Sequence, residues 1–201
     1  MTGTIRTLPP ILLAGALALA GCAGSDAIVT ESPSSTAAAA TAAAGAAPSP
    51  SATALTDDEL LAMMPADAAR DDVAGAMATA EYFVSAYPEA LMAADARVLR
   101  AMSLPTCSFC ADVVADVDHL AETGERLSAG TLSPDLSQLQ AVMDDDGHAH
   151  VQIPVSQSRF EYVDSAGRSA GSSDPGVFVM SFLLTRTDTV WRINGVYVED
   201  A

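Results

Sequence analysis

Lysine is absent from the 201-residue chain, and all nine basic residues are arginines. The chain also carries 26 acidic residues, so its formal net charge at pH 7 is −17. Nucleic acids and anionic lipid headgroups are bound by clusters of Lys and Arg, and this composition excludes a nucleic-acid partner. The acidity indicates either a preference for cationic partners or metal ions, or simple solubility. The complete lack of lysine favours solubility.

Recognisable catalytic motifs are also missing. The sequence has no Gly-x-Ser-x-Gly, no phosphate-binding loop, no nucleotide-binding glycine pattern, no metalloprotease motif and no internal repeat. It therefore selects no catalytic residue and no cofactor. A catalytic acid or base inside a pocket would have to be a titratable side chain, and the sequence spacing of the available candidates identifies no catalytic pair among them. These candidates are Tyr82, Tyr87, Tyr162 and Asp118.

The N-terminus has the layout of an export signal. Arg6 precedes an apolar run over residues 11–20, which is about half of the ~20 residues that a membrane-spanning helix needs. The following segment, Leu19-Ala20-Gly21-Cys22, matches the lipobox of lipoprotein signal peptides. We therefore predict a signal peptide over residues 1–21 and acylation of Cys22, with the chain anchored to the outer face of the cell membrane. The alternative is an ordinary signal peptide with an incidental cysteine.

Two further regions follow the predicted signal peptide. Residues 22–55 consist mainly of Ala, Ser, Thr and Pro, which cannot form a packed core, so they are expected to be a disordered tether. Residues 56–201 are long enough for one domain. Within it, helices are expected over 56–123 and a sheet over 125–198.

The helical part contains clear start and stop signals. Thr56 and Glu59 form a capping-box pattern that opens a short helix ending near Pro65. A longer helix is expected from Asp71 or Asp72, and Pro88 should kink or divide it. The remaining signals are Asp95 as the N-cap of a brief helix, and a helix from about Cys107 to Glu122 that ends at Gly124.

After Gly124 the pattern changes to alternating apolar residues, which is typical of strands. Strands are expected over 126–131, 136–143, 148–163, 176–186 and 190–198. Turns are expected at 144–147 and 187–188, and a longer loop over 164–175. Helices followed by a meander of strands indicate an α+β domain, with the N-terminal helices packed on one face of an antiparallel sheet.

The order of these elements is similar to that of a known family. The sequence resembles actinobacterial lipoproteins that are grouped only as a domain of unknown function. Three parts carry the resemblance: the entry to the second helix, the Trp191 strand and the segment Ser103-Leu104-Pro105-Thr106-Cys107-Ser108-Phe109-Cys110. The resemblance covers roughly residues 64–198, and Ser-x-Pro-x-Cys-x-x-Cys is its most specific part. It implies a bent sheet closed by helices, the cystatin-like cone of nuclear-transport-factor-like proteins. Pro88 departs from the pattern, as does the turn at 124–126.

Cys22 is expected to carry lipid, which leaves Cys107 and Cys110 as a close pair. Outside the membrane such a pair should oxidise to a structural disulfide. Its small loop would stabilise the fold by only about 2 kcal/mol. Two alternatives are thiol–disulfide exchange, because a helix N-terminus lowers a thiol pKa, and metal binding. The βαβ context of a thioredoxin-like site and a second pair of zinc ligands are both missing from the sequence.

Two further groups have side chains of the metal-binding type. His148 and His150 would share one face of a strand, just after the acidic turn 144–146, although a solvated hairpin explains them equally well. Asp112, Asp116 and His119 share one face of a helix, and a wet helix surface is the simpler interpretation. No metal site is therefore predicted.

These observations favour a membrane-anchored, non-catalytic domain that binds a small ligand or a protein partner in the cell envelope. A small-molecule enzyme acting inside the cone is the first alternative. An envelope thiol–disulfide protein using Cys107 and Cys110 is the second.

Overall fold

The computed structural model describes residues 54–201. The predicted signal peptide, the predicted acylation site Cys22 and almost all of the predicted tether lie outside the described residues. Five helices come first: α1 (Asp57–Met63), the 3₁₀ helix η1 (Ala66–Ala69), α2 (Val73–Ala93), α3 (Arg97–Met102) and α4 (Ser108–Thr123). In residues 54–201 no helix is long and apolar enough to cross a bilayer.

The strands follow the helices. They are β1 (Arg126–Ala129), β2 (Leu132–Pro134), β3 (Gln140–Met143), β4 (His148–Gln157), β5 (Phe160–Val163), β6 (Ser169–Ser173), β7 (Gly176–Thr187) and β8 (Val190–Asp200), with the 3₁₀ helix η2 (Leu136–Gln138) between β2 and β3. The α+β class with N-terminal helices and antiparallel sheets is confirmed.

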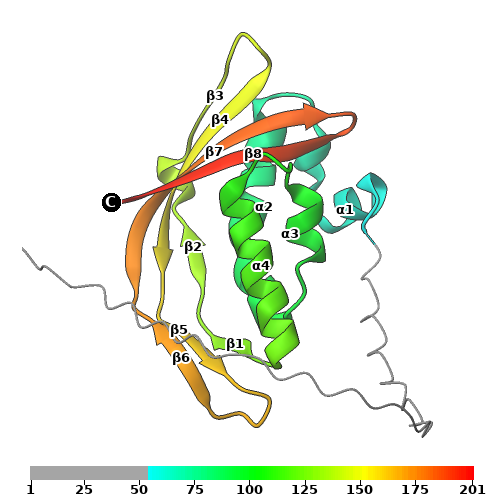
Figure 1. The fold of residues 1–201 in the computed structure, drawn as a ribbon. Coiled ribbons are helices and arrows are strands. Elements are labelled where there is room, and N and C mark those ends of the chain that lie inside the picture. The colour runs from blue at the N-terminus through cyan, green and yellow to red at the C-terminus, as the bar shows by residue number, and fades with distance from the viewer. Residues whose placement is uncertain (1–53) are drawn as a thin grey trace, which may run out of the picture. The chain divides into compact units, whose positions relative to one another are not determined.

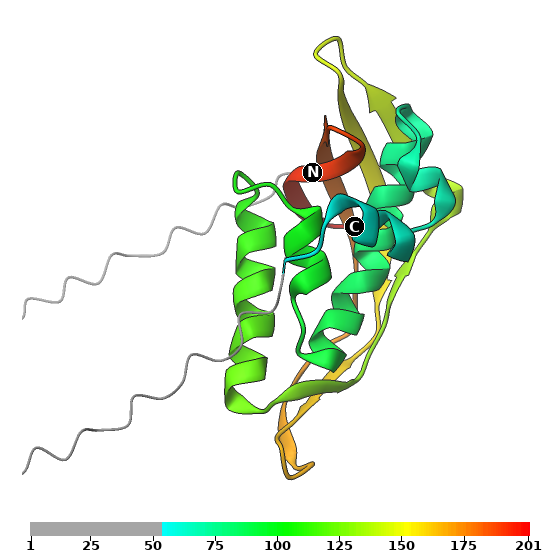
Figure 2. The same cartoon turned by 90° about the vertical axis from the view of Figure 1, so that its right-hand side faces the viewer.

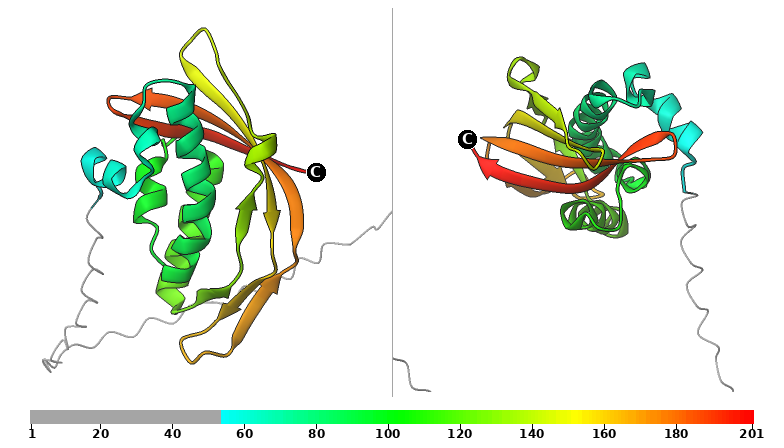
Figure 3. Two further views of the ribbon diagram at one scale, coloured as in Figure 1. Left: turned by 180° about the vertical axis from the view of Figure 1, so that it is seen from behind. Right: turned by 90° about the horizontal axis from the view of Figure 1, so that it is seen from above.

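The strands form two antiparallel sheets rather than one. The larger has the order β2-β4-β7-β8, with β3 also paired to β4, and the smaller has the order β1-β5-β6. The sheets curve past the helices, with the β3–β4 hairpin and the β5–β6 hairpin at opposite ends (Figures 1 and 3). The helices lie together on one side of the sheets, toward the viewer in Figure 2. The helices therefore cover one face of the large sheet and leave the other face open.

Two helix starts follow the sequence signals closely. Thr56 and Glu59 exchange the two hydrogen bonds of a capping box at α1. The Asp72 carboxylate caps α2 by accepting from the backbone N–H groups of Ala74 and Gly75, at 3.1 and 3.2 Å. The Arg70 guanidinium donates to the same carboxylate, and together these contacts lower the pKa of Asp72 to about 2.

Several predictions about element boundaries need correction. The expected strand 136–143 is η2 followed by β3, and the expected strand 148–163 is divided into β4 and β5 of different sheets. Three further corrections have clear physical reasons. Helix α2 continues through Pro88, so the expected division is wrong. Pro88 removes one backbone N–H donor, but its neighbours on both sides, including Val84 and Leu91, are buried in the core, and this packing holds the helix together. At α3 the N-cap residue is Ala96, while Asp95 still accepts from the Arg97 N–H at 3.0 Å.

The third correction concerns the expected loop over 164–175. Residues 169–173 form β6, which pairs with β5 at the edge of the small sheet. Ser and Gly have weak strand propensity, so the pattern of this segment did not indicate a strand. Its pairing is set by the neighbouring strand β5 instead.

The space between the helices and the large sheet is filled by the protein's own side chains. Phe83 of α2 packs edge-to-face on Phe182 of β7, with ring centroids 5.8 Å apart. Around them lie further buried side chains of both layers: Leu60, Leu99, Met102, Ile153, Met180, Leu184, Trp191 and Ile193. This interior is a packed hydrophobic core.

One end of the core is fixed by hydrogen bonds to the Arg70 carbonyl. The Trp191 indole Nε1–H donates to this oxygen at 2.8 Å, and the Arg186 guanidinium donates to it at 2.6 Å. Arg186 also lies over the Trp191 ring, 5.8 Å from its centroid. Gly75 packs against the same carbonyl, where a β-carbon would stand only 2.2 Å from the oxygen. These contacts join the strand pair β7–β8 to the chain between η1 and α2.

Candidate binding groove on the open face of the sheet

The residues suited to acid–base chemistry are scattered. Asp118 forms a surface ion pair with Arg100 at 2.6 Å. Burial raises the pKa of Tyr87 to about 12, and the nearby charges of Tyr162 and Asp116 act in the same direction. Burial also raises the pKa of Tyr82 and of Tyr162. Among residues 54–201 no hydrogen bond joins any two of these four candidates, so the structure does not assemble them into a catalytic pair.

The histidine and aspartate candidates are not grouped in a metal-binding geometry either. His150 Nε2 lies 3.1 Å from the Asp144 carboxylate, whereas His148 Nδ1 lies 3.0 Å from the Thr185 hydroxyl. Asp112, Asp116 and His119 are exposed on α4. The described part of the chain has no group of three His, Cys, Asp or Glu residues placed to hold a metal ion.

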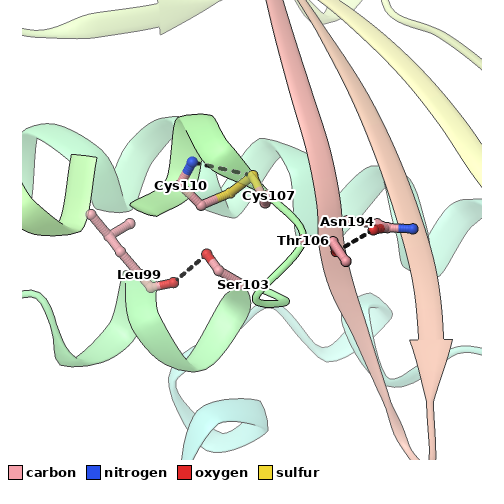
Figure 4. The surroundings of a disulfide bond; sticks show 6 residues. All are labelled: Leu99, Ser103, Thr106, Cys107, Cys110 and Asn194. Carbon is pink, nitrogen blue, oxygen red and sulfur yellow. Dashed lines mark hydrogen bonds between the residues drawn. A yellow bond between two sulfur atoms is a disulfide. The ribbon is translucent and has the colours of Figure 1, made fainter. Parts of the chain in front are cut away.

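Cys107 and Cys110 are joined by a disulfide at the N-terminus of α4 (Figure 4). Cys107 is the N-cap residue, and its sulfur accepts from the Cys110 N–H at 3.2 Å. Each cysteine is only 1% exposed. Thiol–disulfide exchange requires direct attack on a sulfur atom, and this burial blocks the approach of an external thiolate. The geometry therefore favours a structural role.

The segment containing this disulfide is docked on β8. The Leu104 N–H donates to the Ile193 carbonyl at 2.8 Å, next to a parallel bridge between Ser103 and Ile193. The Thr106 hydroxyl donates to the Asn194 side-chain oxygen (Figure 4), and the Asn194 amide donates to the Thr185 hydroxyl at 3.3 Å. The cysteine segment thus holds β8 at residues 193 and 194.

Asn194 is also the position at which the pairing of β7 and β8 shifts by one residue. Leu184 pairs with Ile193, but Leu183 pairs with Gly195, so Asn194 is an extra residue in β8. Such a bulge changes which face the following residues occupy. Val196 consequently packs toward the core, while Tyr197 stands on the open face with 64% of its surface exposed.

The open face of the large sheet contains a groove of about 580 Å³. It is lined by four strands, and two cross-strand rows form its floor. The first row is Gln140, Gln152, Ser181 and Tyr197. The second row is Val142, His150, Leu183 and Gly195. No helix residue lines the groove. It therefore lies on the side of the sheet away from the core.

The groove combines polar and apolar groups. Gln152 donates to the Ser181 hydroxyl at 3.2 Å. The amides and the hydroxyl of the first row can still form further hydrogen bonds. Val142 is 60% exposed, and with Leu183 it makes the second row largely apolar. Gly195 leaves open space, since a β-carbon there would meet no atom within 4 Å.

A second hollow of about 410 Å³ lies on the small sheet. Its lining includes Tyr162, Arg159 and Ser172, and Arg159 is already paired with Asp174 at 2.7 Å. The guanidinium that lines this hollow is thus already paired within the protein.

The sequence did not point to the groove. Alternation along 148–157 and 176–187 indicates which residues face away from the core, but not that the open face is hollowed. The bulge at Asn194 has no signal in the local sequence, so the outward position of Tyr197 could not be predicted.

No protein-family model and no curated protein matches the sequence. Among solved structures, the chain is similar to the intermembrane-space region of the chloroplast protein ARC6, with 14% identity, a TM-score of 0.49 and coverage of 66% of this chain and 99% of that one. Aln2 from a Streptomyces species has 12% identity, a TM-score of 0.40 and coverage of 60% and 87%. An uncharacterised protein with a cystatin-like fold from Caulobacter vibrioides has 12% identity, a TM-score of 0.41 and coverage of 61% and 87%.

These similarities concern architecture alone. The cystatin-like α+β arrangement of this chain rests on its own order of helices and antiparallel strands, which agrees with the fold class predicted from the sequence. At such identities the neighbours carry no information about what the chain binds.

Proposed function

We propose that this protein is a lipid-anchored domain on the outer face of the cell membrane, and that it binds a ligand or partner through the groove on the open face of its large sheet. The groove of about 580 Å³ is the observation that carries the binding proposal, because it falls within the roughly 300–1,000 Å³ of small-molecule sites. The lipobox ending at Cys22 carries the anchoring proposal. We also propose membership of the actinobacterial lipoprotein family, on the strength of the Ser103–Cys110 segment.

A non-catalytic role agrees with how the side chains are arranged. The interior between helices and sheet is packed with apolar residues such as Phe83, Phe182 and Trp191. A reaction inside the cone would require a pocket there with an ionisable group facing it. The open-face groove offers binding groups, namely amides, a hydroxyl and an aromatic ring, and the only ionisable ring at its floor besides the Tyr197 phenol is that of His150.

Anchoring is tested by metabolic labelling with an alkyne analogue of palmitate in a bacterium that processes lipoproteins. We expect label on the full chain, loss of label in Cys22→Ala, and unchanged label in the double variant Cys107→Ala/Cys110→Ala. Label that persists in Cys22→Ala, or that disappears only in the double variant, would contradict acylation at Cys22.

Binding is tested by ¹H–¹⁵N NMR of the full chain with a panel of small uncharged, anionic and cationic fragments. We expect at least one chemical class to shift amide signals of residues 140–142, 150–152, 181–183 and 195–197 together. The matched variants Gly195→Leu and Gly176→Leu separate the groove from the rest of the sheet, because both glycines have open space for a side chain. Shifts that are scattered over the surface, or unchanged in Gly195→Leu, would refute the groove as the binding site.

A further inference from the structure

The groove is lined by no carboxylate and no guanidinium, although the protein is strongly acidic. The chain has 26 acidic residues and a net charge of −17, yet none of the twelve residues that line the groove is an Asp, Glu or Arg. The Asp144 carboxylate, which contacts the His150 ring of the lining, also accepts from the His148 N–H. A cationic ligand would find no carboxylate and an anionic ligand no guanidinium in the floor of this site. The His150 ring there is already bonded to Asp144, so desolvation of a charged ligand would be poorly compensated.

The groups that are present match an uncharged ligand rich in hydroxyls. Gln140 offers two N–H donors and a carbonyl acceptor. Gln152 offers a carbonyl acceptor and the N–H that is not bonded to Ser181, and Ser181 offers a hydroxyl beside them. Tyr197 presents an exposed aromatic ring at the end of the same row. Planar amides for hydroxyl groups, together with an aromatic face for C–H groups, are the combination that a sugar ring requires.

The dimensions agree with a short oligosaccharide. The rows cross four strands, β3, β4, β7 and β8, and three spacings of ~4.8 Å give a groove about 14 Å across. This length accommodates two or three linked sugar rings. The apolar second row, with Val142 and Leu183, would cover the C–H edges of the same rings.

We infer that the open-face groove is a binding site for a neutral oligosaccharide of two or three rings, with one ring stacked on Tyr197 and hydroxyl or acetamido groups bonded to Gln140, Gln152 and Ser181. This inference rests on the proposed function and names the ligand class of the proposed groove. Gly195 has no side chain, so the second row leaves space for the ligand at this position.

The test is isothermal titration calorimetry of the full chain in a zwitterionic detergent, because sugar-headed detergents would compete. The probes are N,N′,N″-triacetylchitotriose, neutral maltotriose, and deacetylated chitotriose, which has the same rings as the first probe but carries positive charge. We expect saturable binding of at least one neutral trisaccharide that changes less than twofold between 50 and 500 mM salt, on the order expected for uncharged partners. The cationic probe should bind, if at all, with strong salt dependence.

Variants locate the site. Gly195→Leu should weaken neutral trisaccharide binding at least tenfold by filling the groove, while Gly176→Leu, on the same sheet but outside the lining, should change it less than twofold. Tyr197→Ala should weaken binding about tenfold and Tyr197→Phe less than threefold, because the phenylalanine ring still stacks. Circular dichroism of each variant verifies that the fold is retained.

Three outcomes overturn the inference. If neither neutral trisaccharide binds while other fragments still shift the groove signals in NMR, the ligand class is wrong but the proposed function stands. If no fragment and no sugar acts on the groove, both fail. If Gly195→Leu leaves sugar binding intact, the groove is not a sugar site. The same conclusion follows if the unmodified chain self-associates in sedimentation experiments and Gly195→Leu abolishes that self-association without changing sugar binding.

Discussion

Replacing Gly75 by alanine should destabilise the protein, although the same change in an ordinary helix is stabilising. Gly75 lies in the first turn of α2, where alanine would gain up to about 1 kcal/mol of helix propensity. Here, however, the new β-carbon would lie 2.2 Å from the Arg70 carbonyl oxygen and 2.9 Å from Trp191 Nε1. The carbonyl would have to move by about 1 Å to reach van der Waals distance.

That movement has a calculable consequence. The Arg70 carbonyl accepts from Trp191 at 2.8 Å and from Arg186 at 2.6 Å, and both bonds would lengthen or break. An unsatisfied buried N–H costs roughly 1–3 kcal/mol, and overpacking adds roughly 1–3 kcal/mol. After subtracting the propensity gain, we expect Gly75→Ala to lower the free energy of unfolding by about 1–5 kcal/mol.

The assay is urea denaturation followed by tryptophan fluorescence. Trp191 is the one tryptophan of the chain, so the emission reports on the indole at the site of the change. Gly176→Ala is the matched control, because a β-carbon at residue 176 meets no atom within 4 Å. If Gly75→Ala proves as stable as the unmodified chain or more stable, the close approach of α2 to the Arg70 carbonyl is refuted.

Two further predictions concern the disulfide and a buried tyrosine. Replacing both Cys107 and Cys110 by alanine should lower the free energy of unfolding by about 2 kcal/mol, the loop-entropy contribution of so short a cross-link, and urea midpoints beside a Ser108→Ala control measure it. No change in midpoint would contradict this value. The second prediction concerns Tyr87, whose pKa of about 12 exceeds the ordinary 10.0, so folding favours the protonated phenol. Its contribution of about 2–3 kcal/mol is fully present below pH 10 and is lost as the pH rises to 12. Denaturation series at pH 9 and pH 11.5 should therefore differ less for Tyr87→Phe than for the unmodified chain, and an equal difference would contradict the burial of this phenol.

The fold could be predicted where the signal is local. The capping box at Thr56, the cap at Asp72 and the C-terminal glycine at residue 124 each act through hydrogen bonds or backbone angles within a few residues, and all three mark observed helix boundaries. Pro88 misled the prediction because a local penalty was overcome by tertiary packing of α2. Strand β6 was missed for the same reason, since its partner strand and not its own composition sets its conformation.

The candidate site could not be predicted from the sequence because it depends on registers. The first row of the groove is made of residues up to 57 positions apart in the sequence: Gln140, Gln152, Ser181 and Tyr197. Only the pairing of β3, β4, β7 and β8 brings them side by side. The sequence drew attention instead to titratable groups such as Asp118, His148 and His150. In the structure these are held by nearby partners, Arg100, Thr185 and Asp144.

The most distinctive sequence segment and the groove are connected through β8. Residues Ser103 to Cys110 contact β8 at Ile193 and Asn194, where the extra residue of the bulge is accommodated. If Asn194 were paired in regular register instead of bulging, the alternation of β8 would place Tyr197 on the core face and Val196 on the open face. The Cys107–Cys110 disulfide does not line the groove, but it closes a turn of the segment that contacts β8 at these residues. We therefore expect the disulfide, by fixing this turn, to help keep the Tyr197 ring on the open face of the sheet.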